Sequence, residues 1–117
     1  ALYSSVGWSN YTNNPAMLRK AYKNSLYVLA AYADGKLVGI LRAVGDGASV
    51  VFLQDLIVLS EFQRHGIGSQ LMRKVMEKYA DVYQLQLLTE ASEKNIAFYE
   101  FLGLKRVEKY GCCAFIR

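Results

Sequence analysis

The stretch SEFQRHGIGS, residues 60–69, joins a strand pattern to a helix pattern. An apolar run over residues 50–59 precedes it, and apolar residues recur at helical spacing after it. We therefore expect a strand, a turn that contains Gly66 and Gly68, and a helix from residue 66 to about residue 79. Such a turn directs several backbone N–H groups and the positive end of the helix dipole at one point, which favours binding of a phosphate group.

Two common phosphate-binding patterns are absent from this stretch. The Walker pattern G-x-x-x-x-G-K-[ST] does not occur, and the dinucleotide fingerprint requires a third glycine where this chain has Leu71. The chain instead has Gln63-x-x-Gly66-x-Gly68 after a strand that ends at Val58. This pattern resembles the Q/R-x-x-G-x-G/A acyl-CoA loop of the GCN5-related N-acetyltransferase (GNAT) family.

A second stretch, NIAFYEFLGL at residues 95–104, resembles the other signature of that family, N-x-x-A/x-x-F-Y-x-x-x-G-F. Asn95 and Tyr99 stand one residue closer together than in the consensus, and Leu104 replaces the common Phe. The two motifs occur in the family's order, and the resemblance covers about residues 26–116.

The periodicity and the turn signals predict an α/β (α+β) chain with one mixed, mostly antiparallel sheet flanked by helices. Asn14 and Pro15 are a typical N-cap and first helical residue, and Asp34-Gly35 is a hairpin signal. The expected helices span residues 14–24, 66–79 and 92–102, after the end of another helix at residues 1–6 and a loop at 5–12. The expected strands span residues 26–32, 36–44, 49–59, 82–88, 105–109 and 112–116.

The resemblance implies an acyl-CoA N-acyltransferase fold, with residues 1–117 forming a single, N-terminally short domain. The family's first strand would precede Ala1, so we expect the sheet to lack it. An exposed sheet edge would then invite pairing with another subunit, as in a homodimer.

Composition narrows the class of protein further. A chain of 117 residues can bury one core, and its net charge of +4 suits a CoA-like polyanion or nucleic acid, or is simply a solvated surface. His65 is the only histidine, which argues against a His-rich metal site and a Ser-His-Asp triad, so we expect no metal. The adjacent Cys112 and Cys113 favour a reducing cytoplasm over a disulfide framework, and no apolar run is long enough to predict a membrane span.

The resemblance assigns binding of acetyl-CoA to the loop, to the preceding strand and to the second motif. The backbone of the loop would hold the pyrophosphate, although a plain turn before a helix is the alternative. Ile57 and Val58 would pair with the pantetheine arm, unless they serve only the core, and Lys94 would assist at the phosphates. The cofactor-binding residues implied in this way are Ile57, Val58, Gln63, Arg64, His65, Gly66, Ile67, Gly68, Ser69, Asn95 and Phe98.

Tyr99 is the candidate general acid, because a phenol can protonate the thiolate that leaves when an amine attacks a thioester. A core aromatic residue is the alternative. Asp55 lies inside an apolar strand, where a carboxylate is costly to bury without a partner. It is either a base or amine anchor, or a carboxylate bonded to a neighbouring loop or basic side chain. Glu90 is a weaker candidate for the same duty.

We therefore expect a cytoplasmic N-acetyltransferase that transfers an acetyl group from acetyl-CoA to a primary amine by direct attack in a ternary complex. The amine would belong to a small molecule or peptide rather than to nucleic acid, and Trp8, Tyr11 and Tyr110 would line its pocket. Three alternatives remain open. They are a CoA-binding module without turnover, a toxin-like acetyltransferase of aminoacyl-tRNA, and a scaffold that binds no CoA.

Overall fold

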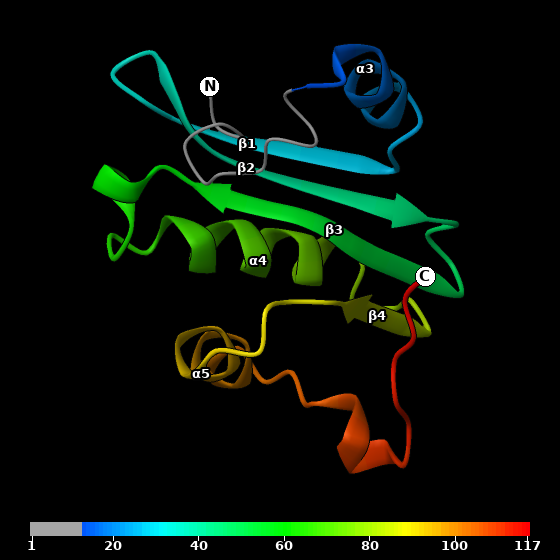
Figure 1. Cartoon of the computed structure of the whole chain (residues 1–117). Helices are drawn as coiled ribbons and strands as arrows, with labels where there is room; N and C mark the ends of the chain where they lie inside the picture. Colours follow the sequence, from blue (N-terminus) through cyan, green and yellow to red (C-terminus); the bar gives the residue numbers. More distant parts are fainter. Residues whose placement is uncertain (1–12) are drawn as a thin grey trace.

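A computed structural model describes residues 13–117, and Figure 1 shows them as one sheet with helices on both faces. The elements in chain order are α3 (Pro15–Lys23), β1 (Tyr27–Ala33), β2 (Lys36–Gly45), β3 (Val50–Val58), the 3₁₀ helix η1 (Ser60–Phe62), α4 (Ile67–Lys78), β4 (Gln84–Leu87), α5 (Glu93–Phe101) and the 3₁₀ helix η2 (Val107–Tyr110).

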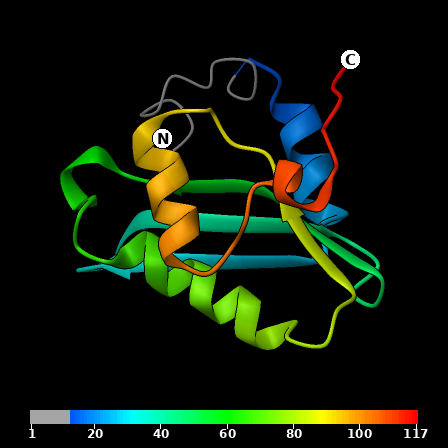
Figure 2. The same cartoon turned by 90° about the horizontal axis from the view of Figure 1, so that it is seen from below.

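The sheet is mixed, as the sequence predicted. Its order is β1-β2-β3-β4, with the first three strands antiparallel and β4 parallel to β3. Helices α4 and α5 cover one face and α3 lies on the other (Figures 1 and 2). Among the described residues β1 forms one edge of the sheet.

Local sequence accounts for the ends of these elements. The Asn14 side chain accepts a hydrogen bond from the Met17 N–H at 3.2 Å, and Pro15 occupies the first helical position of α3. Asp34 and Gly35 both have positive φ, 52° and 77°, as a tight turn between two twisted strands requires. These two predictions are confirmed.

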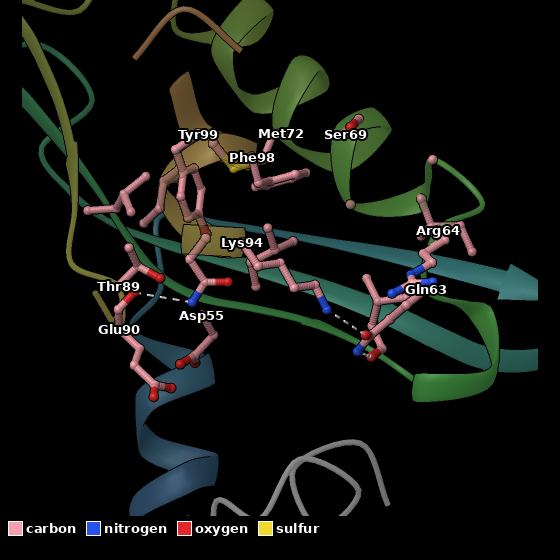
Figure 3. A pocket seen from close by; sticks show the side chains of 18 of the residues that line it. Asp55, Gln63, Arg64, Ser69, Met72, Thr89, Glu90, Lys94, Phe98 and Tyr99 are labelled. Carbon is pink, nitrogen blue, oxygen red and sulfur yellow. Dashed lines mark hydrogen bonds between the residues drawn. The ribbon is translucent and has the colours of Figure 1, made fainter. Parts of the chain in front are cut away.

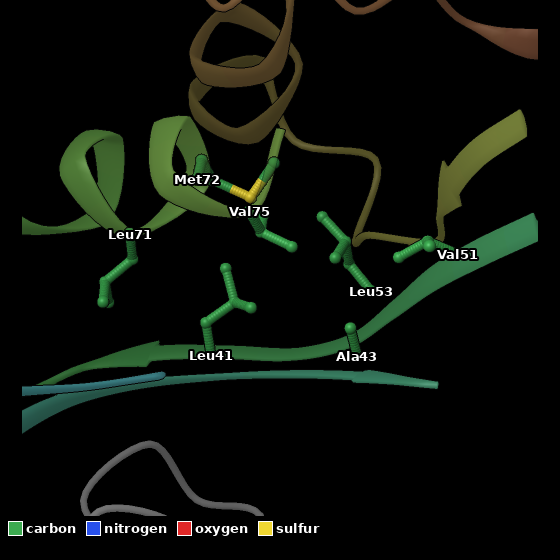
Figure 4. Close-up of a cluster of buried hydrophobic side chains, with 7 residues drawn as sticks. All are labelled: Leu41, Ala43, Val51, Leu53, Leu71, Met72 and Val75. Carbon is green, nitrogen blue, oxygen red and sulfur yellow. The ribbon is translucent and has the colours of Figure 1, made fainter. Parts of the chain in front are cut away.

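The core lies between α4 and the centre of the sheet, with Leu71, Met72 and Val75 of the helix over the strands (Figure 4). The strand residues beneath them are Leu41, Ala43, Val51 and Leu53. The start of α4 comes close to β2, since a Cβ on Gly39 would lie 3.2 Å from Ile67 Cγ2. This packing fixes the N-terminus of α4 beside the end of β3.

The last two predicted strands are wrong. Residues 107–110 form η2, which ends at Gly111 with φ 73°, and none of residues 105–117 is in a strand. Four of the five residues 105–109 are charged, and the Arg106–Glu108 ion pair at 3.0 Å bridges the start of η2. The apolar side chains that follow find no sheet partner, and Phe115 is 91% exposed. The helix and loop expected over residues 1–12 lie outside the described residues.

Among residues 13–117, none of the helices combines the length and the apolar composition that a membrane span requires.

Candidate functional site

Strands β3 and β4 diverge in the middle of the sheet. They pair only from Val50 with Gln84 to Leu53 with Leu87, where β4 ends, while β3 continues to Val58. A bulge begins where the pairing stops. On the other side of β3, Asp55 pairs with Arg42 but Leu53 pairs with Ala43, so that Gln54 is the extra residue. Because a bulge bends and twists its strand, this one turns β3 away from β4.

A pocket of about 750 Å³ opens where the strands separate. Figure 3 shows that side chains reach it from β3, from the loop before α4, from the segment after β4 and from α5. Arg64, Gln63 and Ser69 lie at one end, and Thr89, Glu90 and Asp55 lie at the other.

The backbone of β3 presents alternate residues to this pocket. The Leu59 N–H donates to the Val38 carbonyl of β2 at 2.9 Å. Successive N–H groups of an extended strand point to opposite sides. The Ile57 N–H therefore also points to β2, whereas the N–H groups of Leu56 and Val58 point into the gap. Leu56 and Val58 line the pocket, whereas Ile57 does not and is only 2% exposed. Of the two residues predicted to pair with a ligand, the structure brings only Val58 to the pocket, together with Leu56.

The N-terminus of α4 forms one end of the pocket. Gly66 is the N-cap with φ 80°, no side chain caps the helix, and the Gln70 N–H makes the first intrahelical bond, to the Gly66 carbonyl at 3.0 Å. The N–H groups of residues 67–69 therefore have no acceptor within the helix. Gly68 lies under Phe98, whose Cζ would be 3.4 Å from an added Cβ. A methyl group fits at this position, but a longer side chain would enter the pocket.

Two basic side chains and one amide lie at the same end. The Gln63 side chain donates to the Val58 carbonyl at 2.9 Å and accepts from Lys94 Nζ at 3.4 Å, so it links β3 to α5. Arg64 lines the pocket with a positive φ of 68°. The neighbouring His65 is exposed and does not line the pocket. A polyanion would meet positive charge and helix N–H groups together at this end.

Tyr99 occupies the other end of the pocket, on α5. Burial raises the pKa of its phenol, and a hydrogen bond with the Thr89 side chain acts in the opposite direction. Its ring meets Phe98 edge to face at 4.9 Å. Asn95, one turn earlier, donates from its side chain to the Glu90 carbonyl at 3.3 Å, while its own N–H is capped by Ser92. The phenol therefore stays protonated at neutral pH, and its hydrogen bond with Thr89 holds the hydroxyl at the pocket.

Asp55 has a basic partner on the sheet. Its Oδ2 accepts from Arg42 Nε at 2.7 Å, and the two residues are 2% and 5% exposed. The structure thus contains the ion pair that the sequence left as one of two alternatives. Asp55 also borders the pocket, and its role as a base stays a prediction.

Most of the predicted site residues meet at this pocket. The exceptions are Ile57, His65 and Tyr110, of which Tyr110 is 68% exposed on η2, and Trp8 and Tyr11, which lie outside the described residues. Sequence reasoning missed Thr89, although polar residues just beyond the carboxyl end of a strand in a partly parallel sheet are typical ligand contacts. Met72 was also missed, and its spacing of four residues from Gly68 places both on one helix face.

Comparison with known proteins gives concordant results. The model of the acetyltransferase (GNAT) family matches residues 3–104. A GNAT family acetyltransferase from Streptococcus pneumoniae TIGR4 superposes with a TM-score of 0.91 at 44% identity, over 99% of this chain and 84% of that one. An aminoglycoside N-acetyltransferase solved in complex with CoA shares the fold at 22% identity and a TM-score of 0.69, over 94% of this chain and 89% of that one.

A relative from Prochlorococcus marinus, described as an uncharacterized ycf52-like N-acetyltransferase, is 28% identical over 118 residues. The match covers 97% of this chain and 64% of the relative. The chain therefore spans less than two thirds of that protein's length.

Proposed function

Because the chain belongs to the GNAT family of acetyltransferases, we propose that it transfers an acetyl group from acetyl-CoA to a primary amine of a small molecule or peptide. The observation that carries this proposal is the divergence of β3 from β4 over a pocket with phosphate-binding features at one end and a buried phenol at the other. The activity would arise from direct attack of the amine while both substrates are bound.

The volume and the chemistry of the pocket support acetyl-CoA as the ligand. A volume of about 750 Å³ lies within the range of roughly 300–1,000 Å³ that small-molecule sites occupy. The N-terminus of α4 and the basic side chains of Arg64 and Lys94 suit the phosphates. The open edge of β3 at Leu56 and Val58 suits an extended arm with amide groups, which can pair with it as an added strand. No element of this description requires a metal ion.

Acetyl-CoA supplies an acetyl group bonded to a good leaving group. The protein therefore has to orient the reactants, stabilise the negative charge on the thioester oxygen and protonate the leaving sulfur. The Val58 N–H faces the gap, where it can donate to the thioester oxygen as negative charge develops there. Tyr99 then gives its proton to the departing sulfur. For ordinary phenol and thiol pKa values, near 10 and 8.5, this transfer costs about 2 kcal/mol. Burial raises the pKa of a thiol as well, so the pKa values of the phenol and the thiol stay comparable in the same pocket.

The amine would bind beside Glu90, an exposed carboxylate at the Tyr99 end of the pocket. A carboxylate there attracts an alkylammonium group and can accept its proton, directly or through water. Asp55 is close by but accepts from Arg42, so Glu90 becomes the stronger candidate for this duty. We assign the acceptor only to the class of primary amines.

Calorimetric titration of the chain with acetyl-CoA tests the binding half of this proposal. Gly68→Glu should abolish binding, because its carboxylate would project beside the phosphate site. Gly68→Ala is the matched control and should bind normally, since a Cβ at this position makes only ordinary contact with Phe98. Equal binding by wild type and Gly68→Glu would place the ligand elsewhere, and no binding by the wild type would refute the proposal.

Release of free thiol in the presence of a panel of amines tests the catalytic half. Turnover that depends on both the amine and Tyr99 would support acetyl transfer. Binding without turnover across the panel would favour the CoA-binding module instead. Turnover with aminoacyl-tRNA but with no small amine would favour the toxin-like reaction.

A further inference from the structure

Arg42 and Asp55 form an ion pair directly behind the divergence of the strands. They stand opposite each other on β2 and β3, with Nε and Oδ2 2.7 Å apart. Both side chains are almost completely buried, at 5% and 1% exposure. A charged pair in this position is expensive to desolvate, so its presence in an otherwise apolar sheet calls for a role that apolar residues would not fill.

The pair occupies the regular position directly next to the bulge. From Val58 back to Asp55 the pairing with β2 is continuous, and beyond Asp55 one residue, Gln54, is skipped. A slip of one residue would place an uncharged residue, Gln54 or Leu56, opposite the guanidinium and leave that charge buried without its carboxylate. The ion pair therefore selects which residue bulges, and that choice decides that Leu56 and Val58 face the gap.

Arg42 also ties the bulge to α3 on the far side of the sheet. Its Nη1 donates to Ser25 Oγ at 3.3 Å and to the Ala21 carbonyl at 3.5 Å, and its guanidinium lies 5.5 Å from the centre of the Tyr22 ring. Ala21 and Tyr22 belong to the last turn of the helix, whose carbonyls favour a cation. The guanidinium thus connects three elements at one point.

We propose that Arg42 and Asp55 are positioning residues, which hold the β3 bulge so that the Val58 N–H points at the acetyl carbonyl. This inference rests on the proposed function, because it assigns a purpose to the direction of that N–H. Neither side chain needs to contact the reacting atoms, and Asp55 then acts through the backbone rather than as a base.

The infrared carbonyl band of bound acetyl-CoA, labelled with carbon-13 at the acetyl group, tests this role. In the wild type a hydrogen bond from Val58 should move the band to lower wavenumber than in solution. Arg42→Met/Asp55→Leu replaces the pair with apolar side chains, and should lose that shift while its dissociation constant for CoA changes by less than about threefold. The exposed pair provides the control, Arg106→Met/Glu108→Leu, which should keep the shift.

Amide hydrogen exchange without ligand gives a second readout. Loss of the pair should speed amide exchange at Asp55 and Ile57, whose N–H groups face β2 by the alternation along β3, and leave exchange in α4 unchanged. An unchanged carbonyl band in the apolar variant would overturn the positioning role, as would equal exchange in that variant and the control. Failure of Arg42→Met/Asp55→Leu to fold would assign the pair to stability alone. Absence of CoA binding in the wild type would refute the proposed function itself, while the exchange result still reports on the bulge.

Discussion

Replacing Asp55 with Asn removes one charge of the buried pair while keeping nearly the same volume. Arg42 would then carry a positive charge at 5% exposure opposite a neutral amide. Removing one partner of a buried ion pair typically costs about 3–5 kcal/mol, because the remaining charge stays desolvated. The Asn carbonyl can still accept from Arg42, and Ser25 and Ala21 still accept from its Nη1. We therefore expect a loss near the lower end, about 3 kcal/mol.

Arg42→Met/Asp55→Leu should behave differently. Replacing a buried pair by apolar residues of similar volume is often neutral, so the double variant should lie within about 1 kcal/mol of the wild type. The single substitution would then lower the free energy of unfolding more than the double one. Lost packing alone would predict the opposite order.

Urea denaturation followed by circular dichroism measures both effects. With a slope of about 2 kcal/mol per molar urea, a loss of 3 kcal/mol lowers the midpoint by about 1.5 M. The slope itself should not change. A midpoint lowered by less than about 0.5 M in Asp55→Asn, or a double variant less stable than the single one, would refute this reasoning.

Four further outcomes follow from the structure. Tyr99→Phe should lower kcat by about 10²–10⁴-fold without weakening acetyl-CoA binding, and unchanged turnover in a thiol-release assay would remove Tyr99 as the acid. Burial raises the pKa of Tyr99, so its phenol stabilises the folded state below about pH 10, and this stabilisation is lost as the pH rises through the raised pKa. Comparison of the ultraviolet titrations of the wild type and Tyr99→Phe should show that this phenol ionises at a higher pH than an ordinary tyrosine. Hydrogen bonds from the Ser49 side chain and from three backbone N–H groups lower the pKa of Asp46, so Asp46→Asn should melt earlier above about pH 4 and lose less stability than the wild type on acidification. Leu41→Ala, at a fully buried core position, should cost about 2–5 kcal/mol in a denaturation experiment, whereas Leu88→Ala, at 52% exposure, should cost much less.

Features that depend on neighbours along the chain were predictable from the sequence. Asn14 with Pro15, Asp34 with Gly35, and the glycine loop before α4 each set the backbone through capping or positive φ, and all appear where expected. The end of the site proposed to bind phosphate follows from the same local rules, because a helix N-terminus always carries N–H groups without intrahelical acceptors.

Features that depend on partners distant in the chain needed the tertiary structure. The residue that bulges in β3 is set by Arg42 on another strand, and this decides that Leu56 rather than Ile57 faces the pocket. A carboxylate inside an apolar run shows that a partner is needed but not which one it is.

The C-terminal segment also shows that strand formation depends on partners distant in the chain. Residues 112–116 have the apolar composition of a strand, yet a strand forms only where an edge is available to pair with it. In this structure β4 is short, and residues 107–110 form a 3₁₀ turn instead. Neighbouring residues along the chain therefore determine the elements from α3 to α5 and the glycine loop before α4. The divergence of β3 and β4, and with it the pocket, depended on long-range pairing, since hydrogen bonds between strands join residues that are not neighbours in the chain.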